Sequence, residues 1–159
     1  MKIIAKAPFT RFLIIFLLTS LSAVSTTALS SAATPQIGES YGGGVVFYID
    51  GTGQHGIIVA KTDMPGHSYQ KEEGFFNWYG AKDAATAFVE GFSDWFLPNR
   101  EQLHKLYINR SAAAGMAATV YWSSSEGDAD SAWAENFASG EQLVGSKMNG
   151  SRVRAVRLF

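Results

Sequence analysis

Apolar positions after residue 40 fall first into two short runs, at residues 45–49 and 56–60. Both runs are rich in β-branched side chains, and the glycine-punctuated residues 50–56 connect them. Runs of this length bounded by turn residues predict the two strands of a β-hairpin. Gly42 to Gly44 precede the first strand, and a glycine run permits an unusual or closely packed backbone path there.

Two later stretches have the spacing of apolar residues that is typical of helices. The alanine-rich residues 81–90 predict one helix, with Gly91 as its stop signal. Residues 99–109 predict a second helix. Asn99 is a good N-cap, and Gln102 three residues later completes a capping box.

The remaining apolar patterns predict strands. Residues 95–97 form a short apolar segment that runs into Pro98, which favours extended geometry before it. Alternating or short apolar patterns predict further strands at 120–125, 132–137, 142–145 and 152–159. The last strand places three side chains on one face, namely Val153, Ala155 and Arg157. The order is a β-hairpin, two helices and an antiparallel β-meander, which predicts an α+β fold with a largely antiparallel sheet.

Residues 1–33 have the pattern of a secretory signal peptide. Basic residues (Lys2, Lys6 and Arg11) precede an unbroken apolar run at residues 12–18, and small residues follow up to Ala33. A cut after Ala28 is the alternative, and the apolar run falls short of the roughly 20 residues that a membrane span needs. We therefore expect export, no membrane span after cleavage, and one mature domain at residues 34–159.

Composition narrows the classes of function. Cleavage after Ala33 removes three of the 13 basic residues and none of the 14 acidic ones, so the mature domain has a net charge of −4. A mildly acidic domain has no global attraction for nucleic acid or for anionic membrane. The chain has no cysteine, which excludes disulfides, thiol chemistry and cysteine metal sites.

Several segments together resemble one bacterial family, named after the C-terminal domain of the Legionella collagen-like adhesin. They are residues 37–50 (IGESYGGGVVFYID), 53–58 (GQHGII), 94–99 (DWFLPN) with Glu101 and Leu103, 121–126 (YWSSSE), 132–133 (AW), 136–137 (NF) with Gly140, and 153–157 (VRAVR). The resemblance implies a C-type lectin-like fold, a secreted or surface location, binding of sulfated glycosaminoglycans, and a trimer. Two departures are Phe96, where the family often has arginine, and the lack of a preceding collagen-like Gly-X-Y stretch.

Aromatic residues are the first candidates for a ligand site, since sugar rings stack on aromatic faces. Trp95, Trp122 and Trp133 lie within strands and family motifs, and we expect them in the core because aromatic side chains bury large areas. Asn77, Trp78 and Tyr79 lie at the edge between a loop and a helix. They are the better candidates for exposed ligand-binding residues, because pockets pair aromatic side chains with a few polar groups.

A basic group near the end of the chain is the second candidate. Lys147, Asn149 and Arg152 could bind sulfate groups through charge-assisted hydrogen bonds. For Arg154 and Arg157 we favour a role in stability over ligand binding. We expect these two residues to pair with Asp94, Glu126 or Glu135 and so to hold the sheet together.

Calcium is the one cofactor with candidate ligands, at Glu126, Asp128 and Asp130 in one turn. The turn lacks the EF-hand spacing, and a calcium site needs six or more oxygens, so a solvated acidic turn is favoured. No catalytic residue is indicated, because there is no GxSxG motif and the three histidines are far apart in sequence.

The leading hypothesis is an exported, non-catalytic glycan-binding domain of the adhesin type, with a glycan or another surface ligand as its partner. The alternative is a structural or protein–protein interaction module of the cell envelope. An unrecognised hydrolase is remote, and it would require a nucleophile within hydrogen-bond reach of a histidine.

Overall fold

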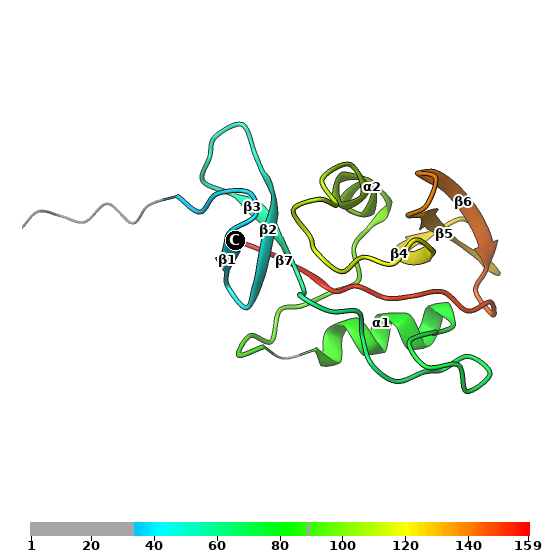
Figure 1. Cartoon of the computed structure of the whole chain (residues 1–159). Coiled ribbons are helices and arrows are strands. Elements are labelled where there is room, and N and C mark those ends of the chain that lie inside the picture. The colour runs from blue at the N-terminus through cyan, green and yellow to red at the C-terminus, as the bar shows by residue number, and fades with distance from the viewer. Residues whose placement is uncertain (1–33, 89) are drawn as a thin grey trace, which may run out of the picture. The chain divides into compact units, whose positions relative to one another are not determined.

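The computed structural model describes residues 34–88 and 90–159, and the expected signal peptide at residues 1–33 lies outside this range. The described chain has an α+β fold with two antiparallel sheets and two helices (Figure 1). The first sheet has the order β1-β2-β3-β7 and the second the order β4-β5-β6. Among the described residues, no helix has the length and apolar content that crossing a membrane requires.

The first sheet contains the predicted hairpin. Its strands are β1 (Ser40–Tyr41), β2 (Gly44–Ile49), β3 (Gly56–Val59) and β7 (Val156–Leu158). Strand β1 was not predicted; it pairs with β2 across the glycine run, where Gly42 and Gly43 have positive φ angles. A Cβ on Gly44 would lie 2.2 Å from the carbonyl oxygen of Val59, which confirms the predicted close backbone approach.

The second sheet is the predicted meander. It consists of β4 (Val120–Glu126), β5 (Ser131–Asn136) and β6 (Glu141–Ser146), each antiparallel to the next. The chain then leaves this sheet, and its last strand β7 pairs with β3 of the first sheet (Figure 1). The meander and the hairpin are therefore separate sheets, which the sequence pattern did not distinguish.

The prediction of one long strand at residues 152–159 is wrong. Only Val156–Leu158 form a strand, and Ser151 and Arg152 make isolated bridges to Phe76 and Tyr121. Residues 153–156 are all at most 1% exposed, so both faces of this segment are covered. A segment buried on both sides does not have the alternating inside–outside pattern of a strand at the surface.

Helix α1 (Trp78–Ala87) begins three residues before its predicted start. Asn77 is its N-cap, and the Asn77 side chain accepts a 2.9 Å hydrogen bond from the Gly80 amide. The helix buries Trp78, Ala81 and Ala85 along one face. It ends before Gly91 because Phe88 takes an extended conformation and packs against Trp95, with the ring centroids 4.9 Å apart.

Helix α2 (Arg100–Ile108) confirms the predicted capping box, with hydrogen bonds in both directions between Asn99 and Gln102. Leu103 and Leu106 on its inner face are buried. The short strand predicted at residues 95–97 is reduced to one bridge, between Phe96 and Val156. Helix α2 packs against β2, β4 and β5, which places its first turn at the end of the second sheet.

Candidate functional site

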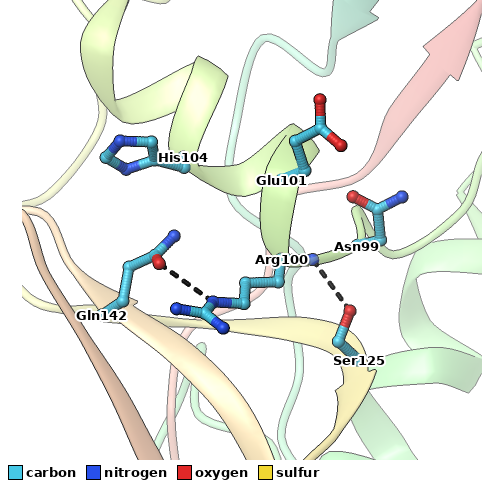
Figure 2. Close-up of a pocket in the computed structure, with 6 residues that line it drawn as sticks. All are labelled: Asn99, Arg100, Glu101, His104, Ser125 and Gln142. Carbon is cyan, nitrogen blue, oxygen red and sulfur yellow. Dashed lines mark hydrogen bonds between the residues drawn. The ribbon is translucent and has the colours of Figure 1, made fainter.

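A cleft of about 470 Å³ opens between the first turns of α2 and the second sheet (Figure 2). Its lining comes from the start of α2, from the end of β4 and from β6. The lining residues are Asn99, Arg100, Glu101, His104, Ser125 and Gln142. All six are polar or charged, so the cleft offers hydrogen-bond donors, acceptors and both signs of charge.

Arg100 is fixed in the middle of this cleft by three contacts. Its guanidinium carbon lies 3.4 Å from the centroid of the Trp133 ring, so the guanidinium group stacks on the indole. Its Nε donates to Oε1 of Gln142 over 2.9 Å, and its backbone amide donates to Ser125 Oγ, also over 2.9 Å (Figure 2). Stacking together with a fixed Nε holds the guanidinium plane in one orientation.

His104 and Glu135 form a second contact at the cleft. The Nδ1 atom of His104 lies 2.9 Å from Oε1 of Glu135, which is on the central strand β5. The Glu135 carboxylate is 1% exposed, whereas the His104 side chain is 45% exposed. Trp133 and Glu135 are two residues apart on β5, so they share the sheet face that α2 covers.

Glu101 is the exposed acidic group of the cleft. Lys105, one turn further along α2, donates a 2.8 Å hydrogen bond to it. This hydrogen bond and the lysine charge lower the pKa of Glu101. Glu101 is therefore ionised at neutral pH, and Lys105 partly neutralises its charge, so that Arg100 supplies the cation most directly available to a ligand.

The arrangement does not form a nucleophile–histidine pair. Within residues 34–88 and 90–159, no serine or threonine hydroxyl is hydrogen-bonded to a histidine. Ser125 accepts from the Arg100 amide instead, and Figure 2 shows Ser125 and His104 on opposite sides of Arg100. Hydrolysis by a serine–histidine mechanism has no assembled site in this part of the chain.

The expectations for the tryptophans were wrong in two of four cases. Trp95 and Trp122 are in the core as predicted, but Trp133 is half-buried beneath Arg100. Trp78, predicted to be exposed, is 3% exposed, and its Nε1 donates to the backbone oxygen of Ser123. It is buried because α1 begins at this residue and turns the ring towards the second sheet.

The neighbours of Trp78 remain at the surface. The Tyr79 side chain is among the exposed large hydrophobic groups at 52%. Asn77 is half-buried, and its side-chain oxygen is occupied by the helix cap. Of the three ligand candidates around α1, Tyr79 is the exposed aromatic side chain.

Lys147 is buried, at 3% exposed. Its ammonium group donates to Oε2 of Glu126 and to the backbone oxygens of Asp128 and Ala129. It also lies 4.7 Å from the centroid of the Trp78 ring. The acidic turn therefore surrounds a cation that belongs to the protein itself, and a buried ammonium in this position is not accessible to a sulfate group.

The three calcium candidates do not converge on one point. Glu126 turns to Lys147, and Asp128 accepts a hydrogen bond from the Asp130 amide. No group of three or more histidine or acidic side chains in the described ranges is placed to hold a metal ion.

The other basic candidates divide between surface and interior. Asn149 is exposed, whereas Arg152 is half-buried and its Nη1 lies 3.3 Å from Oδ2 of Asp63. Arg157 pairs with Asp94, which is one of its predicted partners. Arg154 does not pair with any predicted partner, because its Nε donates to Oδ1 of Asp63 over 2.7 Å.

No pattern in the sequence indicates the cleft. Arg100 and Ser125 are 25 positions apart, and Arg100 and Gln142 are 42 apart. A local signal did exist for Arg100, because the capping box fixed the start of α2 and therefore placed this residue at the first helical position. What was missing was the partner strand, which depends on how α2 packs against the second sheet.

The fold and the cleft define a small α+β domain with an open polar site between a helix start and a three-stranded sheet. A family model described as the Lcl C-terminal domain matches residues 59–157. The chain belongs to the Lcl C-terminal domain family, which confirms the resemblance found in the sequence. No curated protein matches the chain significantly.

Proposed function

We propose that this chain is an exported, non-catalytic glycan-binding domain and that the cleft beside α2 holds the ligand. The observation that carries the proposal is the Arg100 guanidinium group, stacked on Trp133 and fixed by Gln142 inside an open polar cleft. The sequence of residues 1–33 supports export. The resemblance to the family supports a sulfated or otherwise anionic glycan as the ligand.

The chemistry of the cleft suits a ligand with many hydroxyl groups and at least one negative charge. Among its side-chain nitrogens, Arg100 hydrogen-bonds to the described residues through Nε, which leaves the two terminal nitrogens as donors. A fixed guanidinium group binds carboxylate or sulfate through two parallel hydrogen bonds. Asn99, Glu101 and Gln142 add acceptors and donors for hydroxyl groups.

We propose a C-type lectin-like fold on the same basis. The order of a hairpin, two helices and a meander agrees with the resemblance. A homo-oligomer, such as the trimer that the resemblance implies, would raise the avidity of a shallow site for a repeating glycan.

Arg100→Ala is expected to weaken binding of heparin by about ten- to hundred-fold, because a bidentate charged contact contributes on the order of 1.5–3 kcal/mol. Binding of purified mature protein is measured against heparin and a panel of neutral glycans across a salt series. Arg100→Lys should recover only part of the affinity, since lysine keeps the charge but loses the planar fork.

Arg110→Ala is the matched control. Arg110 is an exposed arginine just beyond the end of α2, and its guanidinium carbon also lies over an aromatic ring, 4.1 Å from the centroid of Tyr107. The Tyr79→Ala and Asn149→Ala variants test the exposed members of the candidates from the sequence. If these two variants lose binding while Arg100→Ala binds as well as the unmodified protein, the ligand site lies outside the cleft.

A second function is favoured by the outer edge of the second sheet. Strand β6 pairs with β5 alone among the described strands, and it carries the exposed side chain of Val144, with Met148 shortly after it. An open strand edge with exposed apolar groups suits protein–protein contact. A folded protein that binds no glycan in the panel would favour this interaction module of the cell envelope.

A further inference from the structure

The His104–Glu135 pair sits at the cleft but has no role in holding Arg100. Glu135 lies on the central strand of the second sheet and is almost fully buried. Its Oε1 contacts the Nδ1 of His104, while its buried Oε2 has no hydrogen-bond partner among the described residues. A buried carboxylate with so few partners is costly for stability, which points to a use in function.

This contact fixes the histidine ring. An ionised carboxylate only accepts hydrogen bonds, so the hydrogen of a neutral His104 lies on Nδ1. Its Nε2 then carries no hydrogen in the neutral ring and carries one in the protonated ring. The exposed part of His104 lines the cleft, as Figure 2 shows, so the ring offers its outer edge to a ligand.

The charges around His104 decide what its protonation does. On its own helix are Arg100 and Glu101, the latter paired with Lys105, and Tyr107 stacks at 6.4 Å with an interplanar angle of 18°. From the sheet, Glu135 is the charged group, while Gln142 and Ser125 are neutral. A protonated His104 forms an ion pair with a buried carboxylate and places a second cationic group in the cleft that contains Arg100.

We propose that His104 is a ligand-contacting residue oriented by Glu135, and that the cleft binds anionic glycans more tightly as the pH falls. The inference rests on the proposed function. Histidine is the side chain whose charge ordinarily changes between about pH 5 and pH 8. A protonated ring donates from Nε2 to a sulfate or carboxylate oxygen, whereas the neutral ring does not.

The test is the affinity of the mature protein for a heparin-derived oligosaccharide between pH 5.5 and 8.0 at constant ionic strength. Because one added cationic contact at an exposed site has a modest effect, we expect affinity at the acidic end to be about five-fold higher. His104→Gln should remove this dependence while keeping a polar side chain. His67→Gln is the control, since His67 is also partly exposed and lies 3.7 Å from Glu73 outside the cleft.

Glu135→Gln tests the charge of the buried carboxylate, because the glutamine oxygen can still accept the hydrogen bond from Nδ1 of His104. The variant removes a buried charge and keeps the shape of the side chain, so it should fold, and it should flatten the pH profile because a protonated His104 then has no carboxylate to pair with. Equal affinity of the unmodified protein at both pH values overturns this inference and leaves the proposed function standing. No binding at any pH overturns both, and a profile that persists in His104→Gln overturns the role of His104.

Discussion

Replacing Asp63 with alanine is expected to lower the free energy of unfolding by about 3–5 kcal/mol, because it leaves a buried positive charge without its counterion. Arg154 is 1% exposed, and its three bonding nitrogens are directed to Asp63, to the Ala60 carbonyl and to the Gly115 carbonyl. Asp63 is the only carboxylate among these partners, so alanine removes all of the compensating charge.

Asp63 also holds two other groups. The Tyr121 hydroxyl lies 3.0 and 3.1 Å from its two oxygens, and Arg152 contacts it from the side. Burial is the main cause that raises the pKa of Tyr121, so the hydroxyl stays protonated and donates to Asp63. The cluster joins β4 to the buried C-terminal segment, and its loss should affect both sheets.

Urea unfolding of Asp63→Ala measures this effect, and Asp83→Ala on the exposed side of α1 is the control. Because replacing a buried pair by apolar groups is often tolerated, the double variant Asp63→Ala with Arg154→Met should recover much of the lost stability. A loss below about 1 kcal/mol in Asp63→Ala would be the size of a surface pair and would contradict a structural role for the cluster.

Lys147→Ala is expected to cost about 2–3 kcal/mol of unfolding free energy, because two backbone carbonyls and one carboxylate lose a charged donor. Lys147→Met removes the ammonium group but keeps a long aliphatic side chain that fills the buried site, so it should cost less. Glu126→Gln should cost little, since the Glu126 side chain is 57% exposed. Thermal and urea unfolding should therefore rank Lys147→Ala as the least stable of the three variants and Glu126→Gln as the most stable. Equal stabilities would contradict this ranking.

The contact between Lys147 and Glu126 also makes the stability of the fold depend on pH. The hydrogen bond from Lys147 is the largest cause that lowers the pKa of Glu126 below its ordinary value of 4.5. A lowered pKa in the folded state means that this contribution is present above about pH 4.5 and is lost as the pH falls through the lowered value. Glu126 is exposed to solvent, so the contribution is small.

Because the Lys147 ammonium group takes one carboxylate oxygen and two backbone oxygens of the acidic turn, we propose that the domain does not depend on calcium. Melting temperatures of the unmodified protein should agree in calcium and in EDTA. A higher melting temperature in calcium would show a cation site that the described residues do not reveal.

Local signals predicted much of the fold. The hairpin follows from two β-branched runs around a glycine turn, and the start of α2 follows from Asn99 and Gln102. Each of these depends on residues within a few positions of one another. The meander was predicted for the same reason, since its strands are joined by short turns.

The candidate site depended on contacts that are distant in sequence. Which tryptophan is buried depends on how each helix packs against the second sheet: α1 turns its own first residue, Trp78, towards β4, whereas Trp133 on β5 lies beneath the Arg100 guanidinium group of α2. Arg154 found Asp63 instead of the predicted partners because the C-terminal segment runs beside residues 60–64. No local pattern carries that information, so sequence analysis chose Trp78 and Lys147 for the surface although both are buried.

The most direct test of the glycan-binding cleft is an amide and side-chain chemical-shift map of the mature protein titrated with a heparin-derived oligosaccharide. We predict that the shifts centre on the Arg100 side chain, the Trp133 indole, His104 and Gln142, and that they fade as salt is raised. Shifts centred on Tyr79 and Asn149, or no shifts in a folded protein at low salt, would contradict the assignment of the ligand to this cleft.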